Sequence, residues 1–167
     1  MKSVKSLMLS ILLMQLTACT APSYYSQAIS GHMKLMRERQ SIETLIESEQ
    51  TDPALAGKLT LALQIREFAA SRLGLDTGDS YTQYVATGQS AATWNVVAAP
   101  EFSLKPRTWC FPVSGCVSYR GYFKQEAAEE YAQKLADKAF DVVVSPAIAY
   151  STLGWFDDPL LDTMLQY

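Results

Sequence analysis

Residues 117–145, VSYRGYFKQEAAEEYAQKLADKAFDVVVS, decide the fold. The stretch opens with a β-branched and aromatic run, 117–123, that is typical of a strand. An amphipathic helix follows over 125–139, with acidic residues early and lysines late, as the helix dipole favours. A second β-branched run, 141–145, predicts another strand. Strand, helix and strand in this order predict a helix that crosses over one face of a sheet.

The residues before this stretch add one strand and several helices. Thr93–Ala99 has the composition of a strand, and Pro100 ends it. Residues 74–92 are rich in Gly, Asp, Ser and Thr and predict a loop with a short turn near 81–85. We therefore expect an α+β fold: amino-terminal helices packed on a small mixed β-sheet, with a crossover helix and β-β-α-β order in the second half. The expected helices are 21–40, 42–46 and 53–73.

The third of these helices has clear start and stop signals. Asp52 is a good cap residue, Pro53 suits the first helical position, and Gly74 suits the end. Its polar residues form only a narrow strip, and apolar residues cover most of the remaining circumference. So wide an apolar arc predicts a core helix that is buried on more than one side.

Composition limits the kind of protein. The chain has 167 residues, of which 49% are hydrophobic and 19% charged, typical of one globular domain. The formal charge of −3 becomes −5 without residues 1–18, because Lys2 and Lys5 are lost and 12 basic residues then face 17 acidic ones. No basic cluster is left to bind a phosphate backbone, so we expect no nucleic-acid partner.

The first 18 residues have the pattern of an export signal. Lys2 and Lys5 precede the apolar run Leu7–Leu16, which is too short to span a bilayer comfortably. The residues leading into Cys19, Leu-Thr-Ala-Cys, resemble the bacterial lipobox. The alternatives are an ordinary signal peptide with a chance cysteine, or a short membrane anchor.

The lipobox interpretation predicts a lipoprotein signal peptide over 1–18 and a single domain over 19–167, incomplete at its carboxyl end. Lipid on the thiol of Cys19 would tether the domain to a membrane, which is its first expected partner. Thr20, rather than an aspartate, follows this cysteine. We therefore expect the outer membrane of the cell envelope, with the domain facing the periplasm.

Few side chains suit catalysis or metal binding. Five residues lie between Cys110 and Cys116, which in an oxidising compartment predicts a structural disulfide; a two-thiol metal site or a redox centre is the alternative. His32 lies on the apolar side of its helix and is expected to be a packed, hydrogen-bonded residue. Asp157 and Asp158 precede Pro159, the pattern of a helix cap, although paired carboxylates also suit a metal.

Two longer strings are familiar. WNVVAAPEFSLKPRTWCFPVSGCVSYRGYF, within residues 94–124, and AYSTLGWFDDPLLDTML, at 149–165, resemble a family of bacterial predicted zinc aminopeptidases that are usually lipoproteins. The resemblance covers essentially the whole chain after the leader. It implies that this sequence is the amino-terminal part of such an enzyme, whose substrate is a peptide cut from its amino end.

The resemblance also implies zinc as the cofactor of the full-length family. There a His-Glu-x-x-His helix supplies two zinc ligands and a general base, just downstream of the block at 149–165. This sequence contains one histidine and no such motif, so no catalytic, cofactor-binding or metal-binding residue can be carried over from the family. We therefore expect no zinc to be bound to this chain.

Two explanations remain open: a truncated enzyme, or a degenerate copy acting as a non-enzymatic periplasmic lipoprotein in binding or envelope assembly. Truncation predicts that residues 142–144 and 160–165 are exposed, because they are apolar and would meet the missing part. The candidate for one wall of the substrate groove is the segment nearest the absent metal helix. It comprises Tyr150, Ser151, Thr152, Leu153, Gly154 and Trp155.

Overall fold

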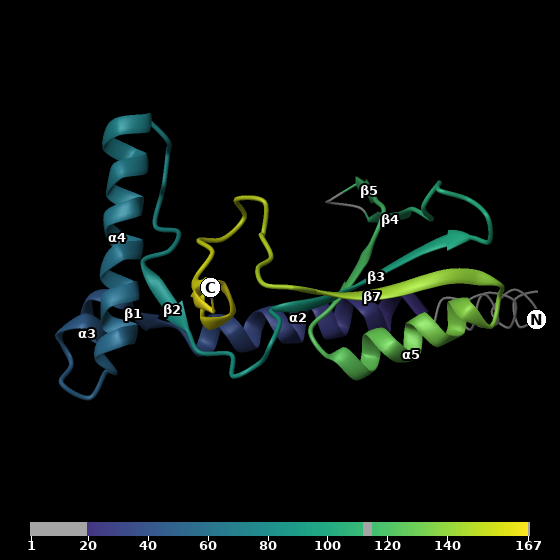
Figure 1. Cartoon of the computed structure of the whole chain (residues 1–167), viewed down its shortest axis with the longest axis horizontal. Helices are drawn as coiled ribbons and strands as arrows, with labels where there is room; N and C mark the ends of the chain where they lie inside the picture. The colour runs from purple at the N-terminus through teal and green to yellow at the C-terminus, as the bar shows by residue number, and fades with distance from the viewer. Residues whose placement is uncertain (1–19, 112–114, 167) are drawn as a thin grey trace, which may run out of the picture.

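The computed structural model describes residues 20–111 and 115–166; the expected leader at 1–18 and Cys19 lie outside these residues. The helices in chain order are α2 (Thr20–Arg37), α3 (Ile42–Glu47), α4 (Pro53–Leu73), α5 (Gln125–Ala136) and the 3-10 helix η2 (Asp162–Leu165). The strands are β1 (Gln40–Ser41), β2 (Gln83–Val85), β3 (Thr93–Pro100), β4 (Trp109–Phe111), β5 (Gly115–Val117), β6 (Arg120–Tyr122), β7 (Phe140–Ala147) and β8 (Leu160–Leu161). The chain is elongated, with α4 at one end of the long axis and α2, α5 and the β3–β7 pair running along it (Figure 1).

The central sheet has the order β6-β3-β7, with β3 antiparallel to both neighbours. β6 and β7 are therefore parallel to each other, and α5 connects them across one face of the sheet. Ala128 and Leu135 of α5 pack against Val96 and Ala98 of β3, and all four are buried. The predicted α+β fold and the β-β-α-β order are thus confirmed.

Two smaller sheets complete the fold. β1, β2 and β8 form the mixed one, in which β2 pairs antiparallel with β1 and parallel with β8. The prediction that residues 74–92 form only a loop was wrong, because β2 lies within it as the middle strand. β4 and β5 form a hairpin in which Cys110 and Cys116 are directly opposite and joined by a disulfide. The run predicted as one strand at 117–123 is divided between β5 and β6.

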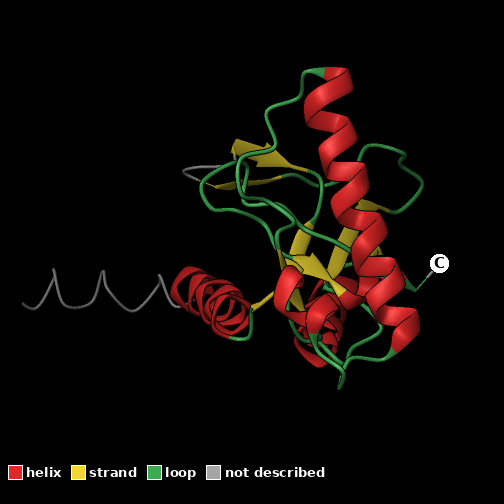
Figure 2. Ribbon diagram, turned by 90° about the vertical axis from the view of Figure 1, so that its left-hand side faces the viewer, coloured by secondary structure: helices red, strands yellow, loops and turns green. Residues whose placement is uncertain are grey.

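Helix α2 is fixed to the sheet by an aromatic cluster around Arg120. The guanidinium carbon lies 4.0 Å from the ring centre of Tyr24 in α2 and 4.5 Å from that of Tyr131 in α5. Cation–π contacts of this kind are strengthened where water is excluded. Burial raises the pKa of Tyr122, whose ring lies beside the same guanidinium, so its hydroxyl stays neutral. Figure 2 shows α2 nearly end-on beside the body of the molecule, with α4 upright in front.

The boundaries of α4 were predicted correctly, but its surroundings were not. The Asp52 carboxylate accepts hydrogen bonds from the first turn, and Gly74 ends the helix with a φ of 65°. Leu59 is buried against α3 and β8, but most of the apolar arc faces solvent. The expectation of a core helix was therefore wrong. A wide apolar arc shows that a helix could be buried on several sides, but among the described residues only one side of α4 is covered.

The carboxyl-terminal end of the chain is buried more deeply than expected. Leu160 and Leu161 of β8 are buried, as is Thr163, whose hydroxyl donates to the carbonyl of Ile148. In β7 only Val143 of the valine run is well exposed, since its neighbours face α5. The predicted exposure was thus wrong for 160–165 and correct for one residue of 142–144. Pairing of β8 with β2 is what covers the leucines.

Candidate functional site

The segment expected to form a groove wall, 150–155, lies in an ordered loop between β7 and β8. Asp158 organises this loop: its carboxylate accepts hydrogen bonds from the backbone N–H of Thr152, at 3.2 Å, and from the Thr152 hydroxyl, at 2.8 Å. The backbone N–H of Asp158 donates to the Ser80 hydroxyl, which joins the loop to the turn before β2. The prediction that the Asp-Asp-Pro sequence caps a following helix was therefore wrong. The N-cap position of η2 is Leu161.

Helix α2 contacts the same loop through His32. Its Nδ1 lies 2.9 Å from the hydroxyl oxygen of Tyr150, and its ring centre lies 4.9 Å from that of Phe156. Burial lowers the pKa of the imidazole, an effect that the nearby Asp158 carboxylate opposes. Burial also raises the pKa of Tyr150 to about 12, so the phenol remains a neutral hydrogen-bonding group. His32 is thus the packed, hydrogen-bonded residue that the sequence predicted.

On its outer side the loop presents apolar side chains to solvent. Leu153 and Trp155 are each 67% exposed, and Phe156 is 56% exposed. Leu153 and Gly154 both adopt a positive φ, of 56° and 80°, which turns the chain sharply at the tip. The loop therefore combines a backbone fixed by Asp158 with an apolar outer surface. Sequence reasoning missed the part played by Asp158, because only its distance to Thr152 in space reveals it.

Beside this loop, β7 is an edge strand of the central sheet. It pairs with β3 along its whole length, from Phe140 to Ala147, and the sheet order leaves its other side without a strand partner among the described residues. Such an edge can hold an extended peptide by main-chain hydrogen bonds. Pro146 lacks an N–H and restricts pairing near the end of the strand.

An apolar groove lies between α4 and the carboxyl-terminal residues. Its volume is about 620 Å³, and we call it the α4 groove. Lys58 spans it by donating to the carbonyl of Leu165, and Arg66 donates to the carbonyls of Gly78 and Ser80. The apolar residues that line it are Leu61, Ala62, Ile65, Ala69, Leu75, Leu160, Met164 and Leu165. An open groove of this composition is suited to binding a further apolar segment.

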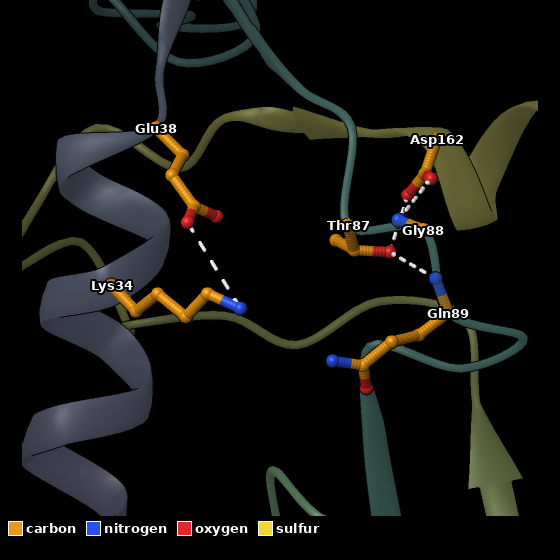
Figure 3. A network of polar contacts seen from close by, with 6 residues as sticks. All are labelled: Lys34, Glu38, Thr87, Gly88, Gln89 and Asp162. Carbon is orange, nitrogen blue, oxygen red and sulfur yellow. Dashed lines mark hydrogen bonds and ion pairs between the residues drawn. The ribbon is translucent and has the colours of Figure 1, made fainter.

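A smaller and more polar pocket, of about 310 Å³, lies between α2, residues 87–92 and the start of α5. On one side Lys34 and Glu38 of α2 form an ion pair at 4.0 Å (Figure 3). On the other, Thr87 lines the pocket, and its hydroxyl donates to the carboxylate of Asp162 behind it at 2.6 Å; the same carboxylate accepts from the N–H of Gly88 at 2.9 Å. Lys124 is the third charged residue of the lining, which includes no histidine, cysteine or tyrosine, so we assign no nucleophile or general base to this pocket.

The described residues do not fit a zinc ion. Among residues 20–111 and 115–166, no three His, Cys, Asp or Glu side chains are grouped closely enough to bind a metal. His32, the one histidine of the sequence, directs Nδ1 to Tyr150, and Nε2 is buried without a partner in the described part of the chain. Cys110 and Cys116 are joined to each other. We therefore assign no hydrolytic step to these side chains.

The residues expected to form the membrane anchor are not among those that the structure describes. Cys19 and the 1–18 leader lie outside the described residues. Within the described ranges, no helix has both the length and the apolar character needed to cross a bilayer. The groove-wall residues 150–155 are brought together in one loop, as above, but they do not line the α4 groove or the pocket beside Lys34.

Comparison with known proteins identifies the family. Residues 23–167 match the model of the family described as "Putative aminopeptidase". No curated protein and no solved structure matches the chain. The match begins at Ser23, the fourth residue of α2, and continues to the carboxyl end of the chain. At the coarsest level the function of this family is that of a peptidase. The chain belongs to this aminopeptidase family.

Proposed function

We propose that this chain is the amino-terminal part of a lipid-anchored zinc aminopeptidase, an enzyme that removes residues from the amino end of peptides. The observation that carries the proposal is the family match over residues 23–167 in a sequence with one histidine. The zinc ligands then belong to a His-Glu-x-x-His segment that this sequence does not contain. Bound zinc in such an enzyme polarises the scissile carbonyl and activates water.

In this proposal the present residues shape the substrate groove. Leu153 and Trp155 offer exposed apolar surface for peptide side chains, and the bonds from Thr152 to Asp158 keep the loop in one conformation. Pre-ordering matters because a loop that orders only on binding weakens affinity. The free edge of β7 would hold the peptide backbone in extended form.

The α4 groove would receive part of the remaining polypeptide. Leu61 and Ile65 are 54% and 59% exposed in the chain as described, and both line this groove. Covering apolar surface contributes about 25 cal/mol for each Å² removed from water, so a segment packed there would be stabilised. The Lys58 and Arg66 contacts to backbone carbonyls hold the two sides of the groove in place.

The membrane anchor is the second part of the proposal. A lipidated Cys19 would hold the enzyme at the outer membrane, facing the periplasm, because several acyl chains anchor durably. Mass spectrometry of the chain expressed from its own leader in a Gram-negative host tests this directly. We expect residues 1–18 to be absent and acyl chains to be present on Cys19; an intact leader or an unmodified thiol would contradict it.

A non-enzymatic periplasmic lipoprotein is the competing proposal, and the shortage of metal ligands favours it. The DNA after the Tyr167 codon discriminates between the two. A frame that encodes His-Glu-x-x-His, in phase or shifted by one base, supports the aminopeptidase. A stop codon followed by unrelated sequence supports the binding module.

Kinetics of the completed protein test the groove wall. Trp155→Ala removes an exposed side chain that makes no described hydrogen bond, so the fold should be unchanged. We expect kcat/KM for peptides to fall about tenfold, equivalent to roughly 1.4 kcal/mol, with zinc content unaltered. Tyr119→Ala, which removes an exposed aromatic ring between β5 and β6, is the matched control. Equal kinetics for the two variants would remove the segment from the substrate groove.

A further inference from the structure

The loop that joins β3 to β4 presents two fully exposed apolar side chains. Phe102 is 96% exposed and Leu104 is 103% exposed, the two largest exposed fractions among the apolar residues described. Burying such side chains is favourable, so their exposure on an ordered loop calls for a partner. We call residues 101–108 the tip loop.

The tip loop is held in one conformation. The N–H of Ser103 donates to the carbonyl of Pro100 at 3.0 Å, and the N–H of Arg107 donates to the carbonyl of Ala98 at 2.7 Å. The Arg107 guanidinium lies 5.6 Å from the Trp109 ring centre and 5.5 Å from that of Phe140, which fixes the base of the loop. Phe102 itself adopts a φ of 60°, in the left-handed region, so the turn directs its side chain outward at some cost in backbone energy.

The tip loop lies at the same end of the molecule as the start of α2. Figure 1 shows the first residues of α2, the β3–β4 connection and the α5–β7 turn together at one end of the long axis, opposite α4. The Tyr24 and Tyr25 rings lie 5.4 and 6.4 Å from the ring of Phe111, so the first turns of α2 contact β4, the strand that follows the tip loop. α2 begins at Thr20, the residue that follows Cys19 in the sequence.

We propose that the tip loop is a membrane-insertion element: Phe102 and Leu104 enter the interfacial region of the bilayer to which the chain is tethered. The inference rests on the proposed lipid anchoring at Cys19. An anchor placed directly before α2 brings this end of the molecule to the membrane. Amphipathic elements at such a boundary bury their apolar side chains about 5–10 Å into it.

The shape of the tip loop favours a bilayer over a protein partner. Its two apolar side chains are almost completely exposed and line neither the α4 groove nor the pocket beside Lys34, and a fluid lipid surface adapts to a projecting side chain. Charge plays little part, because basic and acidic groups at this end balance. They are Lys105, Arg107 and Lys138 against Glu101, Asp137 and Asp141. Insertion should therefore depend weakly on salt and on anionic lipid.

Fluorescence quenching tests the proposal. The full chain carrying Leu104→Cys is expressed from its own leader, labelled with an environment-sensitive dye, and reconstituted in vesicles of phosphatidylcholine and phosphatidylethanolamine. Cys110 and Cys116 are bonded and do not react. The matched control is Leu73→Cys, a leucine 60% exposed at the far end of α4. The mass of each labelled preparation reports acylation of Cys19 separately.

We expect emission from position 104 to shift to shorter wavelength with vesicles. Lipid-borne quenchers should reduce it at least about threefold more than emission from position 73, because only the tip enters the interface. Adding Phe102→Ser to the labelled Leu104→Cys chain should bring the quenching close to the control value. Water-like emission at 104 in a preparation with acylated Cys19 overturns the inference and leaves the anchor intact. Quenching at 104 in a preparation whose mass shows neither lipid nor dye on Cys19 supports the tip loop and overturns the anchor.

Two further results would overturn the inference. Equal quenching at 104 and 73 would mean that the protein contacts lipid without orientation. A shift to shorter wavelength without vesicles, rising with protein concentration, would mean that the tip loop docks on a second copy of the chain.

Discussion

Nδ1 of His32 lies 2.9 Å from the hydroxyl oxygen of Tyr150, which joins two residues 118 positions apart in the sequence. The contact ties the middle of α2 to the loop that we propose as a groove wall. Phe156, from the same loop, packs on the imidazole. One side chain of α2 thus contacts two residues that flank the exposed Leu153 and Trp155, so His32 helps to hold the loop against α2.

His32 should make the stability of the chain depend on pH. Burial lowers its pKa below the ordinary 6.5, with Asp158 opposing and Arg39 reinforcing the change. As the pH falls below 6.5, the unfolded state binds a proton that the folded state does not, so the free energy of unfolding falls. Between about pH 7.5 and 5.5 the wild type should therefore lose more stability than His32→Gln, which does not titrate.

Thermal melts of the two proteins at several pH values check this prediction. Tyr150→Phe, which removes the hydrogen bond but keeps the imidazole, should retain the pH dependence. Parallel curves for wild type and His32→Gln would show that the imidazole titrates equally in the folded and unfolded states.

Gly31 should be required for the packing of α2. A Cβ there would lie 2.3 Å from Cγ and Cδ2 of the Phe123 ring and 2.8 Å from its Cβ, atoms close to the backbone that move little. Gly31→Ala should cost about 1–3 kcal/mol through overpacking, despite the better helix propensity of alanine. Gly57→Ala in α4, with nothing within 4 Å, should instead stabilise by about 0.5–1 kcal/mol. Denaturant unfolding measures both, and an equal gain for the two would contradict the close approach of α2.

The disulfide should make a moderate contribution. Cys110 and Cys116 close a small ring, with a sequence separation of 6. Loop-closure entropy for so short a ring predicts a loss of about 2 kcal/mol on replacing both cysteines by serine. Calorimetry in the presence and absence of reductant provides the check. A reductant effect that persists in the double variant would point to some other cause.

The two sides of α4 should differ sharply in their sensitivity to truncation. Leu59 is fully buried, so Leu59→Ala should cost about 2–5 kcal/mol. Leu61 is two residues away and 54% exposed, so Leu61→Ala should change the stability of this chain by less than about 1 kcal/mol. Similar losses for the two leucines would mean that the α4 groove is already filled.

Local signals in the sequence predicted the helices and strands that have cap residues or a repeated apolar pattern. Asp52, Pro53 and Gly74 set the limits of α4, and Ser41, a residue type suited to the position, caps α3. The β-branched runs of β3 and β7 and the amphipathic α5 were sufficient for the α+β order, because each pattern is local and repeated over several residues.

Features that depend on distant pairing could not be predicted in this way. β2 and β8 have three and two residues, too few to show a period, and their pairing is what buries Leu161. Asp158 follows the pattern of a helix cap, but its hydrogen bonds go to Thr152. The exposure of α4 depends on whether another segment covers it, which its own residues do not encode.

We propose that this chain is part of a zinc aminopeptidase and does not itself hold the ligands of the metal. Metal analysis and a peptidase assay of the purified 167-residue chain, free of contaminating proteases, test it most directly. The account predicts far less than one zinc per chain and no release of amino-terminal residues that a chelator blocks. Stoichiometric zinc together with chelator-sensitive release would contradict it.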